Sequence, residues 1–282
     1  TPVITRSYVD TGSLSASLAR RSAVSGIAAM LGAVIGGYLI HATDPGIGIV
    51  ANGLLTLPLV IFVICVRPVA SLKPVRTHPN PMHDIFSRLR NSPQLQRVTV
   101  MSVAMTLLVT PLITMIVPIL NDLDHAPLPS GAGLVLAGVA AGRILVPYLT
   151  KRLLKRRQEL AAASLAAIWA SGIMIMFAAS ALIPLSDFDL VVWTIIGFGF
   201  GASRFTFRPL LFTAAAKSGA EGDEIVNIAT ITTIGTFVSP VGVLFWGFMI
   251  EYIGAPLTVA GCAVASIAVV LVLAGQSRFA RR

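Results

Sequence analysis

The sequence is poor in charge and almost devoid of cysteine. Asp, Glu, Lys and Arg make up only 12% of its 282 residues, about half of the roughly 25% that is usual in soluble domains. The two cysteines, Cys65 and Cys262, lie singly in apolar runs without His or Cys at ligand spacing, so we expect neither a zinc site nor a disulfide framework. Hydrophobic residues instead reach 55%, with a mean hydropathy of +0.85. This composition predicts a multi-span membrane protein.

Long hydrophobic runs divide the chain into candidate membrane spans. A helix needs about 20 apolar residues to cross a hydrocarbon layer about 30 Å thick, and eight runs meet that requirement. The predicted fold is therefore all-α, a polytopic membrane helix bundle of eight transmembrane helices. It has two helices in residues 1–66, a cytoplasmic linker at 67–97, whose prolines and charges exclude another span, and six helices in 98–282. The runs are 22–42, 47–66, 98–120, 130–149, 159–183, 189–211, 226–249 and 254–275.

Lys and Arg are distributed very unevenly between the two sides that these spans define. Eighteen of the 21 fall in the termini and linkers of one side, none falls in the linkers of the other side, and three lie inside spans. Because cationic loops resist translocation, the positive-inside rule predicts that the basic side and both termini are cytoplasmic. We interpret the net charge of +9 as a topology signal in the cell (inner) membrane, with the lipid bilayer and not nucleic acid as the partner.

Polar residues occur along some predicted spans and are almost absent from others, which we call dry. The runs at 47–66, 159–183 and 254–275 carry little beyond isolated Ser, Thr and Asn. A helix that lines an aqueous path must present polar groups along one face, and two other runs do so. The alternative is that these groups bond to their own backbone or pack between helices. The predicted substrate-binding or gating residues here are Ser102, Thr106, Thr110 and Thr114, at four-residue spacing beside Pro111, and Asn227 and Thr230.

Three arginines lie inside the predicted spans. At about 1.5 Å per residue from the outer end, Arg143 and Arg204 lie well inside their spans, whereas Arg208 lies near the inner boundary. Arg208 can extend to cytoplasmic headgroups. A cation near the midplane is costly unless water or a partner reaches it. We therefore predict that Arg143 and Arg204 contact the substrate or the inward gate, the alternative being that backbone carbonyls or an Asp elsewhere hold them.

Glycines spaced four residues apart occur on three of the runs. This spacing lets two helices approach closely, and close packing is the simplest interpretation of it. The same smooth surfaces would also allow one part of a bundle to slide on another. The pairs are Gly32 with Gly36, Gly138 with Gly142, and Gly197 with Gly201.

Two short segments are similar to known transporter motifs. Residues 32–37, "GAVIGG", look like the Gly-Pro-x-x-Gly-Gly motif of drug and proton antiporters, with Ala33 in place of proline. Residues 150–157, "TKRLLKRR", look like an Asp-Arg-x-Gly-Arg-Arg loop, with Lys151 and Leu154 in place of its aspartate and glycine. Both motifs belong to the major facilitator superfamily, which the chain resembles in its two spans, basic linker and six spans. The resemblance implies a helix-packing motif at Gly32, Gly36 and Gly37 and a cytoplasmic loop motif at Arg152, Lys155 and Arg156.

The resemblance also implies a function. Residues 242–264, "GVLFWGFMIEYIGAPLTVAGCAV", are similar to the siderophore and macrolide exporter branch. On that basis the chain holds the last two helices of a first half and a complete second half, lacks four helices, and continues upstream of Thr1. We expect a secondary active transporter that exports a small amphipathic molecule by alternating access, as proton antiport, with a small-molecule substrate and a coupling proton as partners. No cofactor, metal or enzymatic activity is expected.

Other functions remain open at this point. A metabolite or sugar importer of the same superfamily and an inactive truncated transporter fit the same pattern of spans. A channel would also fit the polar stripes, although dry helices between them favour two moving halves. An intramembrane enzyme is less consistent with the sequence, because no span holds paired carboxylates, a His-Glu-x-x-His helix or a Gly-x-Ser-x-Gly turn.

Overall fold

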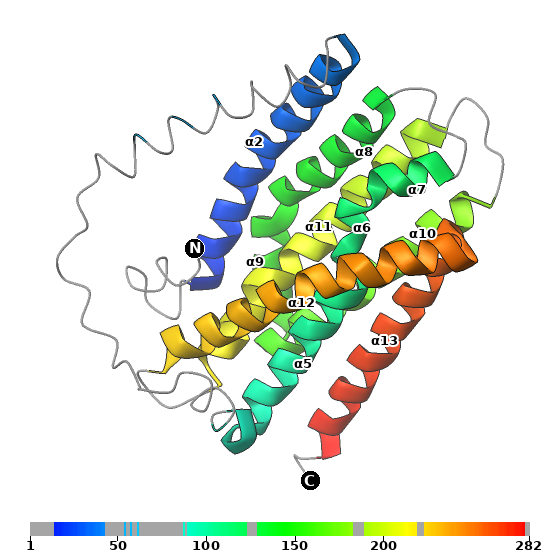
Figure 1. The fold of residues 1–282 in the computed structure, drawn as a ribbon. Helices are drawn as coiled ribbons and strands as arrows, with labels where there is room; N and C mark the ends of the chain where they lie inside the picture. The colour runs from blue at the N-terminus through cyan, green and yellow to red at the C-terminus, as the bar shows by residue number, and fades with distance from the viewer. Residues whose placement is uncertain are drawn as a thin grey trace.

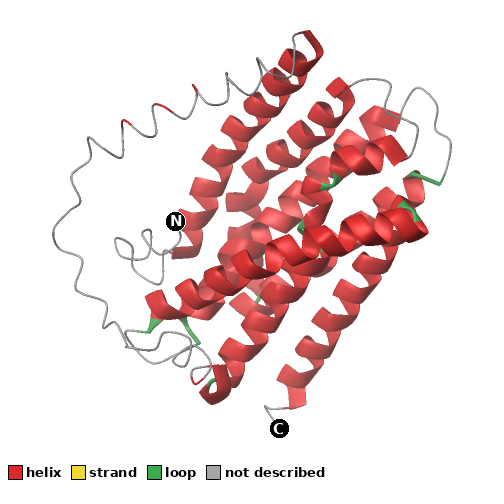
Figure 2. Ribbon diagram, viewed as in Figure 1, coloured by secondary structure: helices red, strands yellow, loops and turns green. Residues whose placement is uncertain are grey.

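The computed structural model describes residues 14–42, 89–122, 129–182, 189–218 and 223–279, together with residues 54, 57, 61 and 87 (Figure 1). All regular structure in this part of the chain is helical (Figure 2). The elements are α2 (Leu14–Ala42), α5 (Pro93–Leu108), α6 (Pro111–Thr114), α7 (Ile116–Asp122), α8 (Pro129–Gly142), the short 3-10 helix η2 (Arg143–Leu145), α9 (Val146–Arg156), α10 (Glu159–Ser180), α11 (Asp189–Ala216), α12 (Glu224–Ile253) and α13 (Ala255–Phe279).

Seven segments of the described chain are long and apolar enough to cross a membrane. They match seven of the eight predicted spans, which confirms an all-α membrane helix bundle. The second predicted span, 47–66, falls almost entirely outside the described residues, as does most of the linker 67–97. The seven segments are Leu14–Gly36, Pro93–Thr114, Gly131–Arg156, Glu159–Ser180, Leu190–Ala216, Glu224–Ile253 and Ala255–Gly275.

Prolines divide two of these spans into shorter helices. After α5 ends at Leu108, the backbone N–H of Thr110 donates to the carbonyl of Met105 at 2.9 Å, one residue further back than in a regular α-helix. Pro111 then begins α6. In the next span, η2 ends at Leu145, and α9 follows it with Pro147 in its first turn. Because proline lacks the N–H and its ring crowds the preceding turn, residues on either side of each break no longer share one regular face.

Helix α11 lies at the centre of the bundle. It packs along α8 on one side and α10 on the other, α2 covers α8, and α13 covers α10 (Figure 1). Helix α5 pairs with α12, which crosses the face shown in the figure. The largest fully buried side chains include Trp193 and Phe200 of α11 and Trp246 of α12. Helices α2 and α12 both contact α11, and this placement positions the site described below.

Helices α8 and α11 approach each other through glycine. A Cβ atom added at Gly201 would lie 2.7 Å from the carbonyl carbon of Val139 and 2.9 Å from its Cα, whereas ordinary contacts begin at 3.4 Å. A Cβ at Gly142 would collide with the carbonyl of Phe198, and one at Gly138 with that of Thr194. Two of the three predicted glycine pairs therefore do form a close helix–helix contact, because any side chain there would push the two backbones apart.

The third glycine pair does not pack in this way. A Cβ added at Gly32 or Gly36 would meet nothing within 4 Å among the described residues, and the side-chain position of Gly37 lies outside them. Helix α2 instead contacts α8 through Gly26, where a Cβ would lie 2.6 Å from Cβ of Arg143 and 2.8 Å from the carbonyl oxygen of Ala140. The close approach of α2 thus occurs one to two turns before the segment that resembles the family motif.

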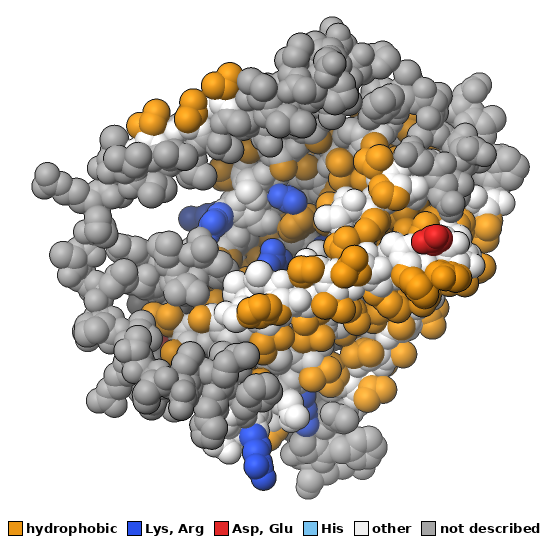
Figure 3. All heavy atoms as spheres, viewed as in Figure 1, with side chains coloured by type: hydrophobic (Ala, Val, Ile, Leu, Met, Phe, Trp, Pro, Cys, Tyr) orange, Lys and Arg blue, Asp and Glu red, His pale blue; other side chains and the backbone are white. Residues whose placement is uncertain are grey.

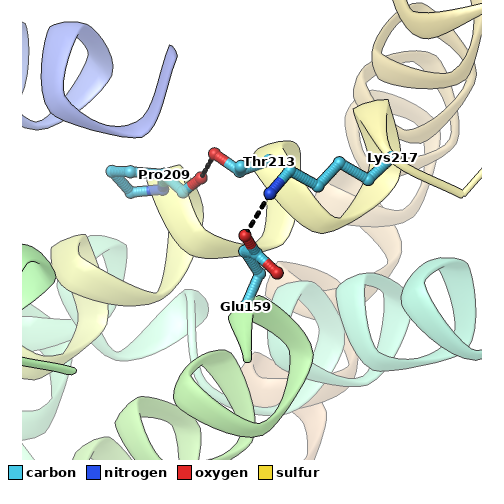
Figure 4. A network of polar contacts seen from close by, with 4 residues as sticks. All are labelled: Glu159, Pro209, Thr213 and Lys217. Carbon is cyan, nitrogen blue, oxygen red and sulfur yellow. Dashed lines mark hydrogen bonds and ion pairs between the residues drawn. The ribbon is translucent and has the colours of Figure 1, made fainter. Parts of the chain in front are cut away.

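Polar contacts join neighbouring helices at both ends of the bundle. Beyond the end of α11, Lys217 Nζ donates to Glu159 Oε1 at the start of α10 at 2.5 Å (Figure 4). Ser92 Oγ, which caps α5, donates to the carbonyl of Ser218 at 2.8 Å. At the opposite end, Trp193 Nε1 of α11 donates to Ser180 Oγ of α10 at 3.1 Å. The starts of α5 and α10 and the end of α11 therefore lie together, as up-and-down spans require.

Candidate functional site

A cavity of about 360 Å³ lies between α5, α11 and α12, within the range of about 300 to 1,000 Å³ that is usual for small-molecule sites. Its walls combine apolar and polar groups. The aromatic and aliphatic part comes from α11 and α12, with Phe207, Leu211, Phe212 and Ile231. The polar part consists of Ser102, Thr106, Thr110, Arg204, Arg208, Thr232, Thr236 and Ser239.

Arg204 is the buried cation of this cavity. Its side chain comes from the middle of α11 and only 5% of the residue is exposed. Its Nη2 donates to Thr110 Oγ1 at 2.5 Å, and Thr110 Oγ1 in turn donates to the carbonyl of Met105 at 3.0 Å. The Nε and Nη1 atoms of Arg204 are buried without a hydrogen-bond partner. The break between α5 and α6 therefore places one hydroxyl against a guanidinium that keeps unused donors.

A second cavity, of about 320 Å³, lies between α2, η2 and α11. Arg143 lines it from η2, with its Cζ 3.7 Å from the centroid of the Phe205 ring. The Nε atom of Arg143 is also buried without a partner. Arg21 and two serines of α2 complete the polar wall. Three residues, Arg208, Phe212 and Thr232, line both cavities, so the two cavities adjoin at Arg208.

Basic side chains gather in a hollow between α2 and α12 on the face shown in Figure 3. Of the described residues that line the two cavities, none is acidic. The carboxylates of the described residues are engaged or distant: Glu159 pairs with Lys217, Asp223 and Glu224 begin α12, and Glu251 is exposed near the end of α12. The two adjoining cavities thus carry positive charge that no described carboxylate neutralises.

Aromatic rings of α11 lie beneath its arginines. Cζ of Arg204 lies 5.7 Å from the centroid of the Phe207 ring, and Cζ of Arg208 lies 5.8 Å from that of Phe212. Cation–π contacts of this kind stabilise a cation by about 0.5 to 2 kcal/mol, depending on how far it is desolvated. These contacts offset part of the free-energy cost of burying the guanidinium groups, but they supply no negative charge to neutralise them. The rings of the segment "RFTFRPLLF" (204–212) therefore support its two arginines without neutralising them.

The predicted site residues divide into two groups. Ser102, Thr106, Thr110 and Arg204 line the first cavity and Arg143 lines the second. Thr114 does not, because it follows the break at Pro111; it is exposed and its hydroxyl donates to the carbonyl of Pro111 at 2.9 Å. Asn227 and Thr230 are buried away from both cavities, and Asn227 Nδ2 donates to the carbonyl of Ala215 at 3.4 Å.

Several cavity residues were not among the predicted substrate-binding or gating residues. On α12 the cavity face runs through Thr232, Thr236 and Ser239; at about 100° per residue, Thr230 lies roughly on the opposite face from Thr232. Arg208, for which an extension to headgroups was expected, lines both cavities, and Arg21, counted among the residues before the first span, lines the second. The four-residue spacing of Arg204 and Arg208 was the available signal for Arg208, since it places both on one helical face.

The remaining predicted residues lie apart from the cavities. Arg152, Lys155 and Arg156 are exposed in the last turns of α9. Among the described residues no group of three or more His, Cys, Asp or Glu side chains is placed to hold a metal ion, and Cys262 is buried in α13. The arrangement brings donors, cations and apolar walls to an internal cavity, and this combination is suited to binding a small molecule.

A comparison with protein families gives one match. A family profile described as Major Facilitator Superfamily matches residues 2–222, which includes α2, α5, η2 and the whole of α11. No curated protein and no solved structure matches the chain.

Proposed function

Because this chain belongs to the major facilitator superfamily, and so to a family of secondary transporters with small-molecule substrates, we propose that it carries a small amphipathic molecule through the two adjoining cavities by alternating access. The direction that we propose is export from the cytoplasm, coupled to proton entry. Binding takes place near the middle of the spans, where helices from different parts of the bundle meet.

One observation carries this proposal. Arg143, Arg204 and the hydroxyls of Ser102, Thr106 and Thr110 come from three different spans and line two cavities that share Arg208. Phe207 and Leu211 provide apolar surface beside them. A cavity of this kind inside a bundle favours a ligand with one apolar and one polar part, and a site contacted by several spans changes shape when those spans move.

The orientation of the chain in the membrane and its place in the exporter branch of the superfamily are part of the same proposal. The uneven distribution of Lys and Arg supports both termini in the cytoplasm of a cell with an inner membrane, and the segments at 32–37, 150–157 and 242–264 support the exporter branch. We assign residues 1–66 to the end of a first half, 67–97 to a cytoplasmic linker and 98–282 to a second half. The described residues of the two cavity linings include no carboxylate and no histidine, so we expect the coupling proton to be carried by a group elsewhere.

Uptake into vesicles tests the proposal. The full chain is reconstituted in liposomes with an imposed pH gradient, and two membrane-impermeant fluorescent probes are supplied, 2-naphthalenesulfonate and (2-naphthylmethyl)trimethylammonium. Uptake above that of protein-free vesicles, with movement of protons in the opposite direction, is expected for at least one probe. Uptake with protons moving in the same direction would favour the importer. No uptake of either probe in either orientation would contradict transport, and chemical conversion of a probe would favour an enzyme.

A further inference from the structure

The two adjoining cavities contain more positive charge than the described residues around them balance. Arg204 and Arg208 line the first cavity, and Arg21, Arg143 and Arg208 line the second. No Asp or Glu is found among the described residues of either lining. Buried cations are normally paired with a carboxylate or held by several acceptors, and Arg204 has one such acceptor, Thr110 Oγ1.

From this imbalance we propose that the cavities form a binding site for a soluble organic anion, a molecule with an apolar body and a carboxylate, sulfonate or phosphate group. The inference rests on the proposed function in treating the cavities as the substrate site, and it specifies the charge of the substrate. The anionic group binds at Arg204, whose Nε and Nη1 atoms have no partner, and extends toward Arg208, which both cavities share.

Guanidinium chemistry favours an oxyanion over other ligands at this point. A guanidinium presents five N–H donors in a planar fork that matches carboxylates and phosphates. A neutral ligand would accept hydrogen bonds from the guanidinium but would leave its positive charge without a counter-charge. A cationic ligand would be repelled by the three arginines within the spans. The apolar residues Phe207, Leu211 and Ile231 accommodate a hydrocarbon or aromatic body, which distinguishes an organic anion from a small inorganic one.

Depth distinguishes a soluble anion from a lipid headgroup. Arg204 lies twelve residues from the end of its span at Ala216, or about 18 Å at 1.5 Å per residue. The polar headgroups begin about 15 Å from the midplane. An anionic lipid would reach Arg204 only by drawing its headgroup toward the centre of the membrane, whereas a soluble anion can enter through an open cavity.

The charge of the cavity can be measured with paired thiol reagents. In a variant that carries Cys65→Ala and Cys262→Ala, Thr236→Cys places one thiol on the α12 wall of the first cavity. Its rates of reaction are measured with anionic 2-sulfonatoethyl methanethiosulfonate and with cationic 2-(trimethylammonium)ethyl methanethiosulfonate. The ratio of the two rates reports the local potential, because any change in thiol ionisation affects both reagents equally. Leu182→Cys, exposed beyond the end of α10, provides the reference ratio.

We expect the anionic reagent to be favoured at Thr236→Cys by roughly tenfold or more over the reference site, since the nearby arginines attract the anionic reagent and repel the cationic one. Arg204→Gln should reduce the ratio several-fold and Arg204→Lys should retain most of it. Arg208→Gln provides a second test if Arg204→Gln fails to fold. Addition of 2-naphthalenesulfonate should slow both reagents, whereas (2-naphthylmethyl)trimethylammonium should not.

Several results would overturn the inference. A ratio equal to that at Leu182→Cys, or one unchanged by both glutamine variants, would show that the arginines are neutralised in the folded protein. A preference that disappears in nanodiscs containing phosphatidylglycerol but persists in phosphatidylcholine would identify a lipid headgroup as the occupant. Uptake of the cationic probe alone would refute the anion site while leaving transport intact, and anion protection without uptake of either probe would retain the site and refute transport.

Discussion

The contact between α8 and α11 gives a sharp test of the packing, because it depends on the absence of a single methyl group. In Gly201→Ala the new Cβ would lie 2.7 Å from the carbonyl carbon of Val139, against an ordinary minimum of 3.4 Å. The obstacle is backbone, which cannot rotate away as a flexible side chain would. Relief requires α8 and α11 to separate by roughly half an ångström or more along their contact, which is a case of overpacking.

The size of the effect follows from two opposing contributions. Overpacking in a close-packed interior costs about 1 to 3 kcal/mol, while replacing glycine by alanine in a helix interior stabilises it by about 0.8 to 1 kcal/mol. Gly172→Ala in α10 isolates the second contribution, because a Cβ there meets nothing within 4 Å among the described residues. Relative to Gly172→Ala, Gly201→Ala should therefore be less stable by about 1 to 3 kcal/mol.

The measurement is unfolding of the purified full chain in detergent, followed by near-ultraviolet circular dichroism during an SDS titration. The thermal midpoint should fall as well, by roughly 2 to 12 °C, on the scale of about 2 to 4 °C per kcal/mol for chains of this size. Equal stability of Gly201→Ala and Gly172→Ala would refute the close contact at Val139. It would also question the placement of Arg143 and Arg204, since α8 leads directly into η2, which carries the first, and α11 carries the second.

Three further predictions follow from individual contacts. Thr110→Val removes the described acceptor of Arg204 Nη2 and should lower the free energy of unfolding by about 1.5 to 3 kcal/mol. Thr110→Ser keeps a hydroxyl and should retain most of the stability of the parent protein. Equal free energies of unfolding for the valine and serine variants would exclude this hydrogen bond as a stabilising one. Gly26→Ala places a Cβ 2.8 Å from a carbonyl of α8, while Gly32→Ala meets nothing nearby, so only the first should reduce the yield of folded protein in size-exclusion chromatography. Arg152→Cys should react with a membrane-impermeant maleimide only after cells are opened, and labelling of intact cells would reverse the proposed orientation.

Hydropathy and charge predicted the spans because these signals accumulate along the chain. A run such as 159–183 is apolar over enough residues to cross a bilayer wherever its neighbours lie, and α10 (Glu159–Ser180) occupies that run. The depth of Arg143 and Arg204 follows from the same count, since the rise per residue of a helix is fixed. These properties do not depend on how one helix is turned relative to another.

The rotation of each helix about its axis could not be predicted in this way. In a membrane, lipid and protein interior are similarly apolar, so hydrophobicity does not distinguish a buried face from a lipid-facing one. Asn227 and Thr230 are as polar as Thr232 and Thr236, yet only the latter two face the cavity. Thr114 does not face the cavity with the other hydroxyls of its predicted stripe, because the backbone break at Pro111 changes the direction of its side chain.

The sequence by itself determined that the chain is a helical membrane bundle, roughly where its spans begin and end, and that Arg143 and Arg204 fall inside those spans. Only the tertiary structure decided that Arg21 and Arg208 join these arginines around two adjoining cavities, and that Gly26, and not Gly32 or Gly36, brings α2 onto α8. The physical reason is that a span is specified by a local sum over residues, whereas a site depends on which faces of separate helices meet.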